Sequence, residues 1–162
     1  MKKYFGDFSV QKKTDIILSF GQIETGLRFE VQTICLKLKH EGYNVKIIKG
    51  LDYRQYLYEL SKSYISVSSW GAGNSCMRMW ESMANKTCCF VQKPEIIIPN
   101  KPQDCLHDVE YSTTVEFETK IRQYLNNKKK CIQIGLDGYN FVKNNHVGAS
   151  RIKYILNIIN SS

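Results

Sequence analysis

Long apolar runs are missing from this sequence of 162 residues. No segment approaches the length that a helix needs to cross a bilayer. The first 13 residues, MKKYFGDFSVQKK, lack the apolar stretch and cleavage signal of a secretory leader. The sequence therefore predicts a cytoplasmic protein with no transmembrane segment.

Common nucleotide-binding and catalytic signatures are also missing. Neither GxGxxG nor GxxxxGK[ST] occurs, which argues against a standard dinucleotide-binding domain and against a P-loop enzyme. No Ser–His–Asp or Cys–His arrangement can be assembled from the order of the residues. The sequence alone therefore identifies no catalytic residue.

Metal-ligand spacing is absent as well. The six cysteines form no CxxC pair, and the three histidines are far apart. Cys88 and Cys89 are neighbours in a predicted strand and should point to opposite faces, which suits neither a shared metal nor a disulfide. We expect reduced cysteines that serve packing, no bound metal and no cofactor.

Positive charge is plentiful, with a net charge of +8 and a pI of about 9.2. The basic residues are scattered along the chain, and only Lys128, Lys129 and Lys130 form a run. A scattered pattern favours a solvated basic surface over a nucleic-acid interface. A phosphorylated small molecule remains a suitable partner for such a chain.

Apolar runs of strand length alternate with amphipathic segments of helical length. The predicted strands are 15–20, 44–49, 64–69, 87–92 and, shorter, 108–111. The predicted helices are 27–41, 53–61, 74–85, a segment capped by Thr113 and Glu116, 130–144 and 148–159. This alternation predicts a single Rossmann-like α/β domain with three α/β/α layers and a parallel sheet. The domain spans 1–162, with a charged lead-in at 1–13 and a C-terminal helix within 146–162.

The stretch 61–92 is the most informative part of the chain. It reads as a strand, a loop containing Gly71 and Gly73, a helix and a second strand. Glycine lets the backbone approach a ligand, and a helix start offers free N–H groups to an anion. The predicted core face of this helix holds Cys76, Met77, Trp80, Met83 and Ala84, and the polar stripe holds Asn74, Arg78, Glu81 and Asn85.

Arg78 and Glu81 admit two interpretations. They are either binding groups next to a phosphate site or a plain surface ion pair at i, i+3 spacing. Arg28, near the start of the first helix, is either a second phosphate ligand or a surface residue.

The loop at 93–103 carries all three prolines and follows a predicted strand. This places it at the carboxyl edge of the sheet, where ligands collect in open α/β folds. Gly21, Glu95 and His107 are therefore candidates to line a cleft there, although a lone histidine is more often structural.

Three motifs between residues 53 and 156 carry a family resemblance. They are YLYELSKSYISVS, the segment RMWESMANKT from Arg78 to Thr87, and the distal GxxGYxxVxxNHxxxSRIxYIL from Gly135 to Leu156. In order and spacing they resemble the C-terminal domain of group 1 glycosyltransferases of GT-B fold, in the variant found in spore maturation protein-like glycosyltransferases.

The resemblance implies that the domain binds a nucleotide-diphosphate sugar. Glu81 would accept hydrogen bonds from the ribose hydroxyl groups, and the backbone from Gly73 through Asn74 and Ser75 to Cys76 would hold the diphosphate. Arg28 would help to neutralise it. The implied activity is a metal-independent, hexosyltransferase-like sugar transfer, completed by an acceptor-binding N-terminal domain or partner subunit.

The sequence departs from the family pattern in two ways. Many members carry a second glutamate eight positions before the ribose-binding one, where this chain has Gly73. A GT-B enzyme also needs two Rossmann-like domains, and this chain supplies one. A catalytically inactive domain that binds a nucleotide or a protein is therefore the main alternative, and a basic nucleic-acid-binding domain is a further one.

Overall fold

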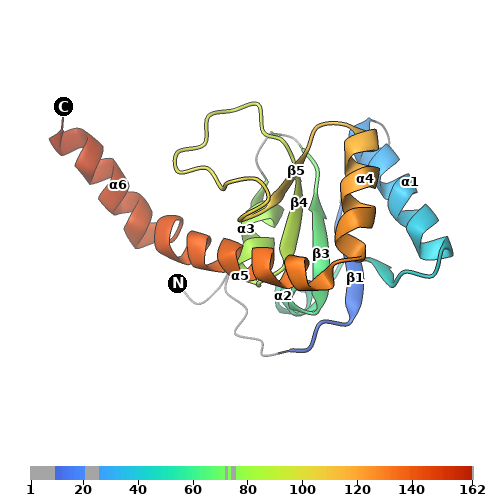
Figure 1. Ribbon diagram of the computed structural model, residues 1–162. Coiled ribbons are helices and arrows are strands. Elements are labelled where there is room, and N and C mark those ends of the chain that lie inside the picture. The colour runs from blue at the N-terminus through green and yellow to red at the C-terminus, as the bar shows by residue number, and fades with distance from the viewer. Residues whose placement is uncertain (1–9, 21–25, 72, 74–75, 162) are drawn as a thin grey trace.

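Five parallel strands form the centre of the protein in the order β2-β1-β3-β4-β5 (Figure 1). The computed structural model describes residues 10–20, 26–71, 73 and 76–161. The strands are β1 (Thr14–Leu18), β2 (Val45–Ile47), β3 (Ser63–Ser68), β4 (Cys88–Gln92) and β5 (Val109–Tyr111). The parallel sheet predicted from the alternating pattern is confirmed, and the strand bounds differ from the predicted ones by one or two residues.

Helices cover both faces of the sheet. They are α1 (Leu27–His40), α2 (Tyr53–Ser61), α3 (Met77–Ala84), α4 (Thr114–Leu125), α5 (Lys128–Asn145) and α6 (Gly148–Asn160). The buried side chains of α1 and α4 share one core with the sheet, whereas those of α2 and α3 pack on the other side. The protein therefore has the three α/β/α layers that the sequence predicts.

Alternation along the strands explains the two cores. Ile16 packs with α1, and its neighbour Ile17 packs with α2. Cys88 and Cys89 likewise belong to opposite cores, as predicted for adjacent strand residues. Strands β1, β3, β4 and β5 are thus buried on both faces, which is why they read as near-continuous apolar runs, whereas the edge strand β2 is partly exposed.

The buried face of α3 differs from the prediction. Met77 is 56% exposed although we expected it in the core, and Asn85 is 2% exposed although we expected it on the polar stripe. Met83 is buried as predicted, and Met79, which was not assigned to the core, packs beside it against β4 and α5. Because α3 packs against α5 as well as against the sheet, its buried face includes Met79 and excludes Met77.

Helix α5 passes close to the amino end of β4. A Cβ atom on Gly135 would lie 2.5 Å from the Lys86 carbonyl oxygen, and one on Gly138 would lie 2.5 Å from the His107 carbonyl oxygen. This confirms the close packing that the two glycines suggest. It also fixes α5 below the sheet, opposite the carboxyl edge (Figure 1).

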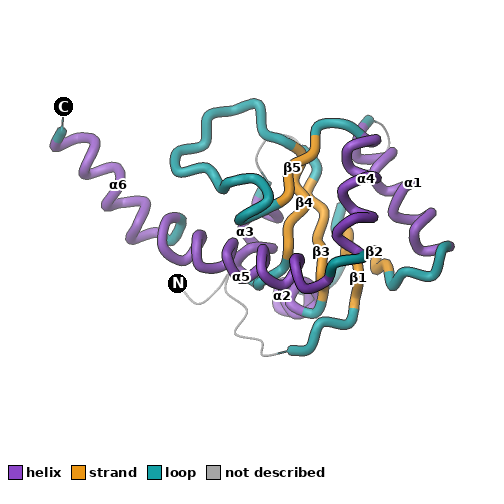
Figure 2. The backbone as a smooth tube through the Cα atoms, viewed as in Figure 1, coloured by secondary structure: helices purple, strands orange, loops and turns teal. Residues whose placement is uncertain are grey.

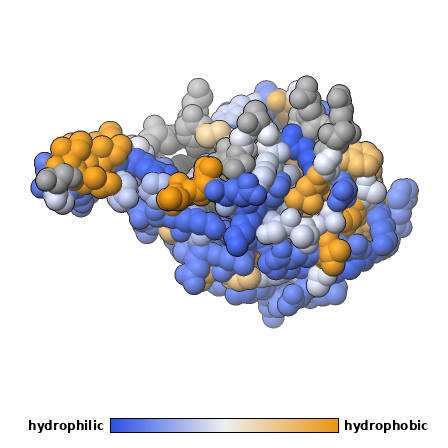
Figure 3. Space-filling view, turned by 90° about the horizontal axis from the view of Figure 1, so that it is seen from above, coloured by the Kyte–Doolittle hydropathy of each residue, from blue (hydrophilic) through white to orange (hydrophobic). Residues whose placement is uncertain are grey.

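Helix α6 projects from the rest of the protein, and none of its described residues is buried (Figure 1). Its large apolar side chains are half-exposed or more: Ile152 at 60%, Ile155 at 54%, Leu156 at 51%, Ile158 at 50% and Ile159 at 63%. Figure 3 shows this apolar surface at the projecting end of the molecule. Within the described residues, no helix is both long and apolar enough to cross a membrane.

The strand order places a switch in chain direction between β1 and β3. From β1 the chain moves to one neighbour, β2, and then returns past β1 to β3. In open parallel sheets, ligands bind at the carboxyl ends of the strands that flank such a switch point. The residues that follow β1 and β3 are therefore the first place to look for a site.

Candidate functional site

Two arginines meet around one aromatic ring at the carboxyl end of β1. Phe20, two residues beyond the strand, is 1% exposed. The guanidinium carbons of Arg28 and Arg78 each lie 5.2 Å from the centre of its ring. Arg28 comes from the first turn of α1 and Arg78 from the first turn of α3. The fold thus brings two positive charges to the switch point.

The backbone that follows β3 holds the first of these arginines. Arg28 donates hydrogen bonds to the carbonyl oxygens of Ser69 and Trp70. Burial lowers the pKa of its guanidinium, and the neighbouring charge of Arg78 lowers it further. The two positive charges repel each other, and an anion bound between or beside them relieves that repulsion.

Gly71 leaves the room that Arg28 occupies. A Cβ atom at this position would lie 3.0 Å from the Nη2 atom of Arg28. The loop is also tied to β4, because the Trp70 backbone N–H donates to the Gln92 side chain at 2.9 Å and its indole N–H donates to the Gln92 carbonyl at 3.2 Å. Ser69 and Trp70 are therefore held between Arg28 and β4.

One turn along α3 from Arg78, the Glu81 carboxylate accepts two phenol hydrogen bonds. Tyr53 donates to its Oε1 atom and Tyr56 donates to its Oε2 atom, both at 3.0 Å. Both tyrosines lie on α2, which begins where Asp52 accepts two backbone hydrogen bonds. The Glu81 carboxylate is thus held by the helix next to it in the layer.

A small hollow opens beside Tyr56. Its volume is about 80 Å³, and it is lined by Ser19, Ile48, Lys49, Gly50, Leu51 and Tyr56. These residues follow β1 and β2 or lie on α2. The hollow therefore lies at the carboxyl ends of β1 and β2, and Tyr56 links it to Glu81.

The remaining predicted site residues fall in different places. Gly73 is exposed, and its carbonyl accepts from the Gly71 N–H at 3.3 Å. Gly21, Asn74 and Ser75 lie outside the described residues. Glu95 is exposed on the loop that leaves β4. This loop begins at the carboxyl edge, as predicted, and returns to β5 (Figure 2).

His107 is not at the carboxyl edge, contrary to the prediction that it lines the same cleft. Val109 pairs with Phe90 in the parallel sheet, so His107 lies two residues toward the amino edge. Its ring stacks on Phe141 of α5 at 4.3 Å, and its Nδ1 atom accepts from the Gln103 N–H at 3.0 Å. Burial lowers its pKa. His107 therefore helps to pack the loop against α5.

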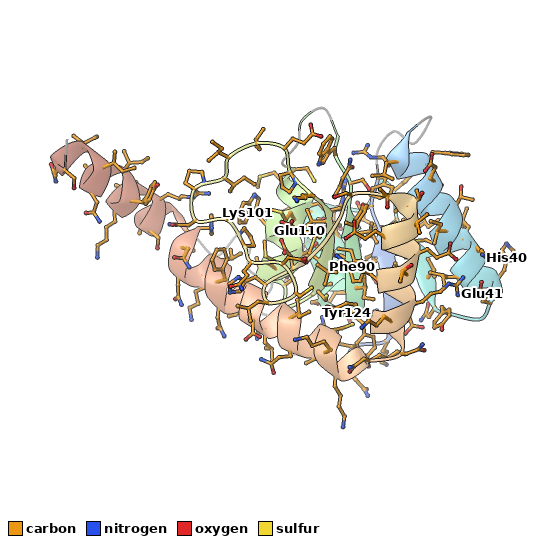
Figure 4. The ribbon with its side chains drawn as sticks, turned by 45° about the horizontal axis from the view of Figure 1, so that its top comes forward. His40, Glu41, Phe90, Lys101, Glu110 and Tyr124 are labelled. Atoms are coloured by element: carbon orange, nitrogen blue, oxygen red, sulfur yellow. The ribbon has the colours of Figure 1, made fainter. Side chains whose placement is uncertain are left out.

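The loop between β4 and β5 is fastened at its far end. Lys101 forms an ion pair with Glu110 at 2.5 Å, and Figure 4 shows the two residues facing each other. The Asn100 carbonyl contacts the His146 ring at 2.8 Å. Among the residues that the structure describes, no three His, Cys, Asp or Glu side chains gather as metal ligands would.

The fold and the switch-point site define the class: this is a Rossmann-like half of a GT-B glycosyltransferase fold. A profile of the glycosyl transferase-like family matches residues 20–157, and the chain belongs to that family. No curated protein sequence matches it. The profile does not test the narrower resemblance to spore maturation proteins, which stays a prediction.

Three solved structures share the fold. A point mutant of TarM from S. aureus, in complex with fondaparinux, α-GlcNAc-glycerol and UDP, is 16% identical with a TM-score of 0.70, over 98% of this chain and 38% of that one. A second TarM structure is 13% identical with a TM-score of 0.71, over 98% and 37%. The C-terminal domain of LpcC, a glycosyl transferase group 1 family protein from Francisella tularensis, is 17% identical with a TM-score of 0.58, over 88% and 90%. The chain thus spans little more than a third of TarM and nearly all of the LpcC domain.

Sequence reasoning missed three members of the site. Phe20 was assigned only to the end of a predicted strand, and Tyr53 and Tyr56 only to the predicted helix at 53–61. The i, i+3 spacing of the two tyrosines places them on one face of α2. The sequence does not indicate that this face of α2 contacts α3 at Glu81.

Proposed function

We propose that this chain binds a nucleotide-diphosphate sugar and forms the donor side of a metal-independent glycosyltransferase. The observation that carries the proposal is the pair of guanidinium groups over Phe20, at the switch point of the sheet. Guanidinium groups form strong, charge-assisted hydrogen bonds with phosphate oxygens. We assign the diphosphate to Arg28, Arg78 and the adjoining start of α3.

The nucleoside then follows the polar line along α3. Glu81 lies one helical turn beyond Arg78, so its carboxylate stands next to the assigned diphosphate. An ionised carboxylate only accepts hydrogen bonds, which suits the two hydroxyl groups of a ribose. The hollow at Gly50, Leu51 and Tyr56 comes next and takes the base. The order phosphate, ribose and base supports a nucleoside diphosphate as ligand.

The rest of the enzyme is a second domain or subunit that binds the acceptor. The chain spans 38% of TarM, and its site is open at the sheet edge. The exposed apolar side chains of α6 offer a surface for that second unit to cover. Gly73, where many family members carry a glutamate, removes one contact to the donor sugar. This departure keeps the inactive nucleotide-binding domain as the second candidate.

The test is calorimetric titration with the uridine, guanosine, adenosine and cytidine diphosphates and their monophosphates. Arg78→Ala should weaken diphosphate binding by about tenfold or more, because a charge-assisted bond to phosphate is lost. Monophosphate binding should fall less. Arg54→Ala is the matched control, since Arg54 is exposed on α2 and its loss changes the net charge equally. No binding of any nucleoside diphosphate, or equal effects of the two substitutions, would overturn the proposal.

A further inference from the structure

We infer that Tyr53 and Tyr56 are positioning residues that make the site selective for ribose over deoxyribose. The inference rests on the proposed function, because it assigns the ribose to Glu81. It adds a role for two side chains that belong to a different helix from the carboxylate. Both phenol groups reach Glu81 from α2, at 3.0 Å from Oε1 and 3.0 Å from Oε2.

The two phenol hydrogen bonds fix the orientation of the Glu81 carboxylate but do not use all of its acceptor positions. A carboxylate has about four positions that accept hydrogen bonds, two on each oxygen. The two phenols take one position on each oxygen, and therefore one position on each oxygen is left for a ligand. A ribose presents two neighbouring hydroxyl groups, and each can donate to one oxygen. A deoxyribose lacks one of these donors.

The phenols are also reliable donors. Burial raises the pKa of Tyr56, and the negative charge of Glu81 raises it further. A phenol with a raised pKa stays protonated near neutral pH, so Tyr56 remains a hydrogen-bond donor. The two rings are packed together, with centres 6.2 Å apart, so neither tyrosine is held by Glu81 alone. The donors are therefore in place before a nucleotide arrives, which reduces the ordering cost of binding.

Arg78 makes this restraint necessary. It lies one turn before Glu81 on α3, at the spacing where an arginine and a glutamate pair. If Glu81 paired with Arg78, the carboxylate could no longer bind the ribose and the guanidinium could no longer bind the diphosphate. The phenol bonds hold Glu81 toward α2 and keep the two functions apart.

A purely structural role is the competing explanation. The same bonds link α2 to α3, and such a link stabilises the fold whether or not a ribose binds. Ribose selectivity separates the two explanations. Loss of a structural link lowers the melting temperature and affects the ribose and deoxyribose forms equally, whereas loss of positioning lowers the affinity for the ribose form more than that for the deoxyribose form.

The experiment measures the dissociation constants of the tightest-binding nucleoside diphosphate and of its 2′-deoxy form, on the full chain. The wild type should prefer the ribose form by about tenfold, which corresponds to one hydrogen bond to a charged group. Tyr53→Phe with Tyr56→Phe should reduce that preference to less than about twofold, because the freed carboxylate no longer faces the hydroxyl groups. Each substitution keeps the ring and removes only the donor.

Tyr58→Phe is the matched control, because Tyr58 lies on the same helix and its ring contacts Lys62 at 4.8 Å. It should keep the wild-type preference. Thermal unfolding without ligand accompanies each titration, and the single variants replace the double one if it melts below the titration temperature. A preference that Glu81→Ala abolishes but the tyrosine variants keep overturns the inference and leaves the proposed function standing. A wild type that binds both forms equally overturns it too, and a wild type that binds no nucleoside diphosphate overturns both.

Discussion

Asp108 is a buried carboxyl group with an unusual environment. It is 1% exposed, and within the described residues its Oδ1 atom has no hydrogen-bond partner. Burial raises its pKa from 3.8 to about 7, and the charges of Glu110 and Asp104 contribute, while Lys101 opposes them. The folded protein therefore holds a proton on Asp108 at pH values where the unfolded chain has released it.

We predict that Asp108 weakens the protein as the pH rises. Between the unfolded pKa of 3.8 and the folded pKa of about 7 the native state binds more protons, so the free energy of unfolding falls through this window. Asp108→Asn should stabilise the protein at pH 8 by on the order of 2 kcal/mol and have little effect at pH 4. Urea unfolding at both pH values measures this, and an equal effect at the two would refute the assignment.

Glu81 should matter to binding and, to a smaller degree, to stability. Glu81→Ala is expected to weaken nucleoside diphosphate binding by about 1.5–3 kcal/mol, the value of hydrogen bonds to a charged group. It also leaves the hydroxyl groups of Tyr53 and Tyr56 without this acceptor, at a cost of about 1 kcal/mol in unfolding free energy. Glu41→Ala removes the same charge at the C-terminal end of α1, the opposite end of that helix from Arg28. Calorimetry and urea unfolding compare the two, and equal losses of affinity would show that Glu81 does not touch the ligand.

At the scale of elements, helix α5 depends on two close backbone contacts. The virtual Cβ of Gly135 lies 2.5 Å from the Lys86 carbonyl oxygen, a distance that real side chains do not reach. Helix α5 or the turn before β4 must therefore move to admit any side chain. Since both are packed against the sheet, neither can move without disturbing the core.

We predict opposite signs for two Gly→Ala substitutions in neighbouring helices. Gly135→Ala should destabilise the protein by about 1–3 kcal/mol through overpacking. Gly148→Ala, at the first residue of α6 with no atom within 4 Å of the added Cβ, should stabilise it by about 0.4–1 kcal/mol through the unfolded chain. Thermal or urea unfolding measures both, and a neutral Gly135→Ala would mean that α5 sits farther from β4.

The elements differ in how far the sequence predicts them. Strands buried on both faces leave continuous apolar runs, and the predicted strands therefore match the observed ones within two residues. Helix α3 carries large apolar residues on several sides, so its sequence does not decide whether Met77 or Met79 is buried. Contacts with α5 make that choice. Arg28 was identified from its place near a helix start and Arg78 from the polar stripe that follows the glycine loop, whereas the contacts of Tyr53 and Tyr56 depend on which helices become neighbours.

The wrong prediction for His107 has a similar cause, because its position depends on how a loop returns to the sheet. Its position after a proline-rich loop suggested the carboxyl edge, because loops that leave a strand start there. The loop is long enough to cross back, and the ring stacks on Phe141. A residue placed by the return of a loop cannot be assigned to a sheet edge from its distance along the chain.

At the scale of the whole molecule, the proposed function makes the site one wall of a cleft that a second unit completes. Positioning and electrostatic stabilisation supply most of catalysis, and both need the reacting groups to be enclosed. We predict that the isolated chain binds a nucleotide sugar but transfers the sugar negligibly, apart from slow hydrolysis of the donor. Incubation with sugar nucleotides and an acceptor panel, with the oligomeric state measured in parallel, checks this. Efficient transfer by a strict monomer would show that no second unit is required.

The central claim concerns where a nucleoside diphosphate binds, and an NMR titration of this 18.8 kDa chain tests it most directly. We predict that the tightest-binding diphosphate shifts the indole signal of Trp70 and the backbone signals of Arg78 and Glu81 along one saturating curve. Signals near the hollow at Gly50 should follow the same curve. Shifts confined to the α5 face around His107 and Asn140, or no saturable shifts with any nucleoside diphosphate, would show that the ligand does not bind at the carboxyl edge.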